Sequence, residues 1–264
     1  MTAATTPRPR WQLLRPLPAI ERNLLAWYRT WWVLLSGVFE PIFYLLGMGL
    51  GLGDLVGTIE LAGTIVSYET FVAAGLMASS AMNGAVFDST FNFFFKLKEQ
   101  RTFDAMLNAP LRMVDVLSGE LLWAVGRGSI YSTVFLVVAL LFGAIDSWWA
   151  VFSLPAAILI ALSFAALGSF ATTFVRHWTD FDLVNLAILP MTMGSTTFFP
   201  LSVYPGWAQP LVQATPLYNA VALIRDLNTG LVGWHDVGHV AYLIAMTLLA
   251  GWACSRRLER LLLS

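Results

Sequence analysis

Long apolar segments separated by short polar intervals dominate the chain. Six of them, at residues 31–53, 70–95, 117–143, 150–175, 183–201 and 237–254, carry few charges. Each is close to or above the roughly 20 residues that an α-helix needs to cross the hydrocarbon core of a membrane. The last two are the shortest. The pattern therefore predicts an all-α polytopic membrane protein with six transmembrane helices.

The stretch 202–236 has a different pattern. Four prolines punctuate it or stand just before it, and apolar residues such as Trp207, Leu211 and Val212 lie between them. Proline interrupts a helix, so a straight span is excluded, yet the stretch is too apolar for an ordinary loop. We expect short outer re-entrant helices here.

The N-terminal region mixes apolar residues with Glu21, Arg22 and Arg29 at helical spacing. Such a pattern is typical of a helix that lies in the membrane interface, here with its start near Pro18. A disordered lead-in is the alternative, and it fits residues 1–10 better. We expect residues 1–17 to form a cytoplasmic tail and residues 18–264 to form a single transmembrane domain.

The basic residues fall on one side of the apolar segments. Of 15 Lys and Arg residues, Arg225 lies in an opposite loop and Arg127 within a span, and the others share one face. Because cytoplasmic loops carry the Lys/Arg excess, both termini are expected in the cytoplasm. The shared-face residues are Arg8, Arg10, Arg15, Arg22, Arg29, Lys96, Lys98, Arg101, Arg112, Arg176, Arg256, Arg257 and Arg260.

Composition supports a membrane protein. Hydrophobic residues make up 58% of the chain and charged residues 12%, about half the usual share of charges in soluble domains. The net charge of -1 argues against a nucleic-acid partner, which would require a basic surface. The single cysteine, Cys254, excludes a disulfide within the chain.

The polar interval 96–109, which ends at Pro110, has the length of a short amphipathic helix. Phe103, Met106 and Leu107 would lie on one side of it. It could be a cytoplasmic coupling helix that receives force from a motor protein, or a solvated loop that only supplies positive charge.

Four charged residues lie within the apolar segments: Glu40, Asp88, Glu120 and Arg127. Charges at membrane depth are costly and are therefore functional candidates. Glu120 and Arg127 project from one helix face but lie about 10 Å apart along its axis, so each should pair with another span. Arg127 could pair with Glu40 or Asp88. The alternative is that these charges form structural pairs or lie at the cytoplasmic interface.

Aromatic residues offer a further candidate site. Trp123, Tyr131, Phe198 and Phe199 could stack on sugar rings or planar drugs as a substrate path. Aromatic side chains serve more often as core packing or interface anchors.

Several segments resemble the membrane subunits of type-2 ABC exporters. They are EPIFYLLGMGLGLG at residues 40–53, FVAAGLMASSAM at 71–82 and QRTFDAML at 100–107, followed by Gly119-Glu120 and Phe199-Pro200-Leu201. The nearest likeness is to the permeases of lipo-oligosaccharide exporters, with daunorubicin-resistance permeases more distant. The resemblance runs from about residue 20 to the C-terminus.

This resemblance implies a permease in the bacterial inner membrane, a homodimer surrounded by lipid that binds a separate ATP-binding subunit. ATP and Mg would be bound by that partner and no cofactor by this chain. The substrate would be an amphipathic lipo-oligosaccharide, lipid or hydrophobic drug. The residues carried over to the contact with the ATPase are Lys98, Glu99, Arg101, Thr102, Asp104 and Met106.

Other functions find less support in the residues. Neither lysine has the context of a P-loop, and the Gly47 to Gly53 series follows a membrane helix rather than a strand, so it suits close helix packing better. An intramembrane enzyme using Ser195 would lack a histidine within its span. His235 and His239 have metal-ligand spacing, but the only evident third ligand is Asp236, which would point in a different direction on a helix. We therefore expect neither a metal nor a catalytic site. An ion-coupled transporter remains the alternative transport class.

Overall fold

The protein is a bundle of long helices. The computed structural model describes residues 17–28, 39, 42–61, 63–100, 102, 106 and 113–262. Within them, four helices are long and apolar enough to cross a membrane: Tyr68–Glu99, Met113–Leu141, Trp148–Thr172 and Trp234–Leu261. They agree in position, length and composition with the expected spans at 70–95, 117–143, 150–175 and 237–254.

Each of the four long helices contains one main α-helical segment, and short π-helical or 3₁₀ turns extend two of them. Helix α4 (Tyr68–Phe87) continues through two π-helical turns, η3 (Asp88–Asn92) and η4 (Phe95–Glu99). Helix α6 (Met113–Leu141) stands alone, a 3₁₀ turn η5 (Trp148–Phe152) leads into α7 (Ser153–Thr172), and α11 (Trp234–Leu262) ends the described chain. The Ser67 hydroxyl accepts a hydrogen bond from the Thr70 N–H at 3.1 Å and so caps α4.

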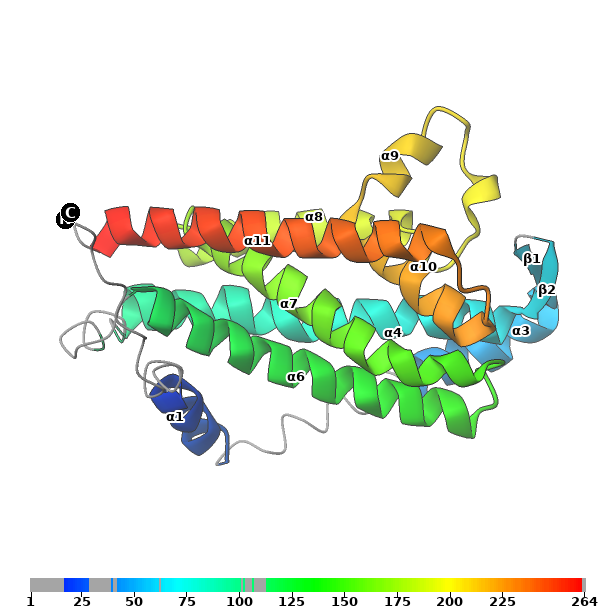
Figure 1. Ribbon diagram of the computed structural model, residues 1–264, viewed down its shortest axis with the longest axis horizontal. Coiled ribbons are helices and arrows are strands. Elements are labelled where there is room, and N and C mark those ends of the chain that lie inside the picture. Colours follow the sequence, from blue (N-terminus) through cyan, green and yellow to red (C-terminus); the bar gives the residue numbers. More distant parts are fainter. Residues whose placement is uncertain are drawn as a thin grey trace, which may run out of the picture.

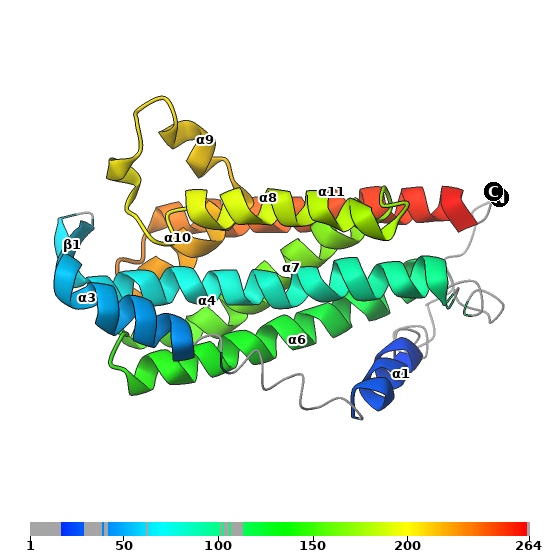
Figure 2. The same cartoon turned by 180° about the vertical axis from the view of Figure 1, so that it is seen from behind.

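Helix α7 crosses the bundle between α6 and α11, and α4 lies behind it against both α6 and α7 (Figures 1 and 2). Helix α10 (Pro216–Thr229) fills the end of the bundle beside α4 and α11. Fully buried side chains fill the spaces between these helices, among them Phe71, Met77, Phe135, Ile160 and Leu217.

Small residues bring the helix backbones together. A Cβ atom on Gly128 of α6 would lie 2.8 Å from the Ala161 Cβ and 2.9 Å from the Ala81 carbonyl oxygen. Close approach at small residues is typical of membrane helices. Gly47 and Gly51, which were expected to allow close helix packing, meet no neighbour in the described chain, because a Cβ at either would meet nothing within 4 Å, so that packing stays a prediction.

Replacing Gly128 by alanine is expected to destabilise the protein by about 1–3 kcal/mol, because the added methyl group has no room between α4 and α7. Gly126 of the same helix is the matched control, since a Cβ there meets nothing within 4 Å. Gly126→Ala should leave stability unchanged or raise it by up to about 1 kcal/mol through helix propensity. Thermal unfolding of both variants in detergent measures the difference, and equal midpoints would contradict the close packing.

Of the two other expected spans, the first lies partly outside the described residues and the fifth is shorter than expected. Residues 31–38, 40 and 41 of the first are not described, and its remainder contains the π turn η2 (Leu45–Leu50) and α3 (Gly51–Val56). The fifth, α8 (Phe181–Gly194), has 14 residues and ends before Leu201 because the chain turns at Thr196, whose φ is 58°. The crossing of the membrane by these two segments stays a prediction.

A short antiparallel hairpin, β1 (Thr58–Leu61) and β2 (Thr64–Ser67), occupies the expected outer loop, with Ile59 opposite Val66. An all-α reading missed it. The predicted N-terminal helix is confirmed as α1 (Leu17–Tyr28), although its depth in a membrane stays a prediction.

The segment between α8 and α11 contains the predicted short helices: η7 (Leu201–Val203), α9 (Gln209–Gln213) and α10. The part that carries α9 stands away from the bundle, whereas α10 is packed within it (Figure 2). Thr215 caps α10 ahead of Pro216, and Gly230, with a φ of 82°, ends it in the left-handed conformation. At the opposite end of the bundle, η6 (Trp178–Asp180) precedes α8.

Candidate functional site

A buried ion pair joins the second and third spans. The Arg127 Nη1 of α6 donates to the Asp88 Oδ1 of η3 at 2.9 Å, and the side chain of Arg127 is 7% exposed. Asn92, one turn along, donates to the same oxygen. Of the two partners that the sequence left open for Arg127, the structure therefore joins it to Asp88, while Glu40 lies outside the described residues.

Aromatic side chains complete the surroundings of the guanidinium. Arg127 Nε and Nη2 both donate to the Tyr131 hydroxyl at 3.1 Å, and the guanidinium lies 5.0 Å from the centre of the Phe87 ring. Cation–π contacts and hydrogen bonds stabilise a charge removed from water. Tyr131 therefore positions Arg127. Tyr131 was expected to stack on a sugar ring, and that role did not include this contact.

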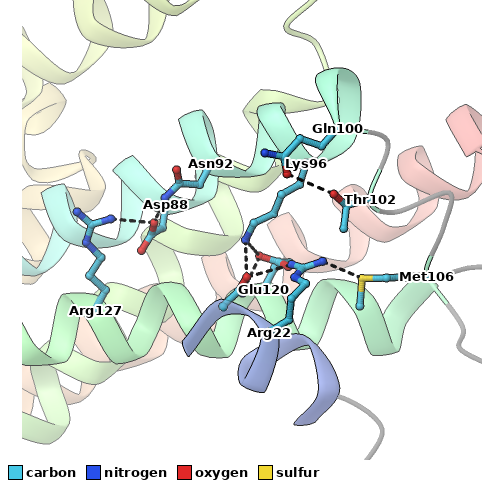
Figure 3. A network of polar contacts seen from close by, with 10 residues as sticks. Arg22, Asp88, Asn92, Lys96, Gln100, Thr102, Met106, Glu120 and Arg127 are labelled. Carbon is cyan, nitrogen blue, oxygen red and sulfur yellow. Dashed lines mark hydrogen bonds and ion pairs between the residues drawn. The ribbon is translucent and has the colours of Figure 1, made fainter. Parts of the chain in front are cut away.

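A second cluster of charges surrounds Glu120, whose side chain is 6% exposed. The Arg22 Nη2 of α1 donates to Glu120 Oε1 at 2.6 Å, and the Lys96 ammonium of η4 donates to Oε2 (Figure 3). Asn23 donates to Oε2 at 3.3 Å and accepts from Lys96 at 3.0 Å. As expected, Glu120 pairs with neighbouring elements rather than with Arg127.

The two ion pairs follow one another along the same pair of helices (Figure 3). Their α6 members, Glu120 and Arg127, are seven residues apart, which brings them to within about 20° of one face. Their partners, Lys96 and Asp88, are eight apart, which on a regular α-helix would rotate one from the other by about 80°. The π-helical turn η3 accommodates one extra residue and restores the alignment.

This second cluster also reaches the expected coupling segment. The Arg22 Nη1 donates to the Met106 sulfur at 3.2 Å, so Met106 is linked to Glu120 through one arginine. Thr102 donates to the Gln100 side chain at 3.4 Å, and Arg101 and Asp104 lie outside the described residues.

The expected start of the coupling helix at residue 96 was wrong. Lys96, Lys98 and Glu99 belong to the last π-helical turn of the second span, which runs to Glu99 instead of ending at residue 95. The long side chain of Lys96 allows its charge to reach Glu120 while its stem remains among apolar neighbours. Lys98 and Glu99 are exposed at this end of the bundle, as a contact with a partner requires.

Two adjoining cavities lie toward the other end of α4. One, of about 170 Å³, has a mainly apolar lining that also contains the polar side chains of Ser79, Ser80, Asn83 and Thr192. The second, of about 560 Å³, has an apolar lining that includes Tyr68, Phe199 and Val203. Both are bounded by the same three side chains, Met48, Met193 and Phe198. The smaller cavity, which is called the polar cavity below because it carries these four polar side chains, thus continues into a larger apolar one.

The four aromatic candidates do not form one surface. Phe198 borders both cavities and Phe199 the apolar one, whereas Tyr131 holds Arg127 and Trp123 lines neither cavity. The serines and asparagine of the polar cavity were missed by sequence reasoning, although they interrupt the apolar run 71–82 and its continuation.

Ser195 donates to the Met191 carbonyl and lies 3.1 Å from the Thr215 hydroxyl, contacts that do not provide a catalytic base.

Comparison with known proteins agrees with this architecture. Residues 19–227 match the family described as ABC-2 type transporter. Nodulation protein J of Rhizobium meliloti is 32% identical over 90% of this chain and 92% of its own length. Nodulation protein J of Rhizobium leguminosarum bv. viciae is 34% identical over 80% of each chain, and Inner membrane transport permease YadH of Escherichia coli is 27% identical over 86% of each.

The family match spans most of the residues, and the nodulation relatives exceed 30% identity over most of both chains. Four helices long enough to cross a membrane fit the same assignment. This chain therefore belongs to the ABC-2 type transporter family, as a multi-pass membrane permease and not an enzyme.

Proposed function

We propose that the chain is the membrane-spanning subunit of an ATP-driven exporter that moves an amphipathic substrate outward across the bacterial inner membrane. The observation that carries this proposal is the pair of adjoining cavities along α4. Ser79, Ser80 and Asn83 offer hydrogen bonds to a sugar or other polar head group, and the apolar cavity accommodates an acyl chain. A lipo-oligosaccharide combines both parts, and a lipid or a hydrophobic drug is the wider substrate class.

Permeases of the ABC-2 type in general partner with an ATP-binding ABC subunit. In our proposal that subunit binds ATP and Mg, and it contacts this chain at the end of the bundle where Lys98 and Glu99 are exposed. Movement there would reach Glu120 through Arg22 and Met106. The Lys/Arg distribution supports a cytoplasmic location for this end and for both termini.

We further propose that two copies of the chain form a homodimer in the lipid. Helix α8 supports this because Leu183, Leu186 and Leu189 recur along one face and are about two-thirds exposed (67%, 66% and 67%). Repeated apolar exposure of this kind is covered either by lipid or by another protein. Gly47 and Gly51, which have no close neighbour within the described chain, offer a second surface for helix packing.

Reconstitution into liposomes, with and without a co-expressed ATP-binding subunit, tests the function. We expect outward movement of a fluorescent lipo-oligosaccharide only when the partner and ATP are present. Export by this chain alone, driven by a proton or sodium gradient, would instead establish the ion-coupled alternative.

The variant Ser80→Leu sharpens the test, because it fills the polar cavity with an apolar side chain. We expect substrate transport to fall by roughly tenfold or more while ATP hydrolysis continues, since a buried polar group of the substrate would lose its hydrogen bonds. Ser255→Leu, at a half-buried position of α11 that lines neither cavity, is the control and should transport normally. Unchanged transport by a folded Ser80→Leu protein would remove the cavity from the substrate path.

A further inference from the structure

Three metal-ligating side chains meet at the end of the bundle opposite α1 and the C-terminus, where α10 ends and α11 begins (Figure 1). They are Asp226, His235 and Asp236, and their ligand atoms all lie within 4.8 Å of one another. The His235 Nε2 is 2.9 Å from Asp226 Oδ2 and 3.9 Å from Asp236 Oδ1. None of these residues belongs to the Asp88–Arg127 ion pair, to the cluster around Glu120 or to the lining of the two cavities.

From this arrangement we infer that Asp226, His235 and Asp236 bind a divalent transition-metal ion of the zinc type. In a tetrahedral zinc site the metal lies about 2.0–2.2 Å from nitrogen and oxygen ligands, which places the ligands roughly 3.3 Å apart. The two observed separations lie on either side of that value, so small side-chain movements admit the ion. One imidazole nitrogen with carboxylate oxygens is a donor set that suits zinc, and water would complete the coordination.

The Asp236 carboxylate gives the second, independent indication of a ligand. Asp236 is 7% exposed, and its Oδ2 accepts a hydrogen bond from the Gly233 N–H at 2.8 Å. Its Oδ1 accepts no hydrogen bond from a permanent donor among the described residues, and it lies 3.9 Å from His235 Nε2 and beside the Asp226 carboxyl group. A buried carboxylate oxygen without a partner is costly, and a bound cation removes that cost.

The local charge balance also favours a cation. Asp226 and Asp236 place two carboxylates beside the same imidazole, at 2.9 Å and 3.9 Å from its Nε2. Arg225, the adjacent residue of α10, is close enough for its charge to act on Asp226, but its guanidinium is hydrogen-bonded elsewhere. It donates to the Thr196 carbonyl at 2.6 Å and lies 3.8 Å from the centre of the Phe71 ring. A dication would offset both carboxylates.

The absence of a side chain at Gly233 leaves room for the His235 imidazole. A Cβ atom on Gly233 would lie 2.8 Å from the His235 ring, so a side chain at residue 233 would displace the imidazole. His235 is 57% exposed, which leaves the ion a path from the solvent. His239, the partner that sequence spacing had suggested, is instead occupied by Asn219, whose side-chain oxygen lies 2.8 Å from His239 Nδ1.

Zinc titration of the tag-free full-length chain, after removal of metal by a chelator, tests the site. In competition with a chromophoric chelator we expect one zinc ion per chain. His235→Gln and Asp236→Asn should each weaken binding by roughly tenfold or more. Zinc should also raise the thermal unfolding midpoint of the unsubstituted chain but not of the two variants.

His239→Gln is the matched control, because it removes a histidine one helical turn from His235 and should leave zinc affinity unchanged. Loss of binding in His239→Gln would overturn the three-residue site in favour of a histidine pair on α11. Absence of stoichiometric binding, or full binding by Asp236→Asn, would overturn it as well. His235 is exposed, so His235→Gln remains a valid test if Asp236→Asn does not fold. The titration requires no transport and is therefore independent of the proposed function.

Discussion

Replacing Asp88 by alanine is expected to lower the free energy of unfolding by about 3–5 kcal/mol. The substitution removes the Asp88 carboxylate that faces the buried Arg127 guanidinium at 2.9 Å. The hydroxyl of Tyr131 and the ring of Phe87 still contact the guanidinium, but neither carries a negative charge. Chemical denaturation of the chain in mixed micelles, followed by tryptophan fluorescence, measures the loss.

The double variant Asp88→Ala/Arg127→Met separates charge from packing. It removes both charges and keeps apolar volume at position 127, so most of the lost stability should return. Asp146→Ala, at an exposed position, is the matched control and should change stability by less than about 0.5 kcal/mol. If the single and double variants were equally unstable, the ion pair would not be the cause.

Replacing Glu120 by lysine is expected to abolish ATP-driven transport and to lower the free energy of unfolding by about 1–3 kcal/mol. The change places three cations together, because Arg22 and Lys96 both contact the carboxylate. Their repulsion should separate α1 from α6 and break the link from Met106 to the third span. The effect on stability is smaller than at Asp88 because Arg22 is partly exposed.

The charge exchange Glu120→Lys/Lys96→Glu tests this explanation, since it restores one ion pair between η4 and α6. We expect it to recover part of the transport rate, measured with the reconstituted complex beside its ATP hydrolysis. Glu120→Gln is the milder comparison, which removes the charge but keeps the hydrogen-bonding shape. Transport at the original rate by Glu120→Lys would show that the cluster has no part in coupling.

The four long spans could be predicted from hydropathy because length and apolar composition are sufficient for a membrane helix. Their ends could not. The second span was expected to end at residue 95 because Lys96 and Lys98 are charged, but a helix continues wherever a long side chain can carry its charge to a partner. The fifth was expected to reach Leu201, although the chain turns at Thr196, whose positive φ follows from tertiary contacts rather than from its residue type.

The candidate charges within the spans were identifiable from the sequence because charged residues at membrane depth are rare. Their partners were not. Arg22 lies 98 residues from Glu120 and was expected only to face the membrane surface. The polar cavity was missed because serine and asparagine scarcely alter the hydropathy of an apolar run. Recognising it required the neighbouring side chains of η2 and α8.

The extra residue in η3 has a mechanical consequence. A single attachment between two helices leaves them free to swivel or to slide, whereas two attachments on one line remove both freedoms. Because the inserted residue brings Asp88 and Lys96 into line with Arg127 and Glu120, a shift of either helix along the other would break both bonds together. We therefore expect α4 and α6 to move as one rigid unit when force acts on the end of the bundle that carries Lys98 and Glu99.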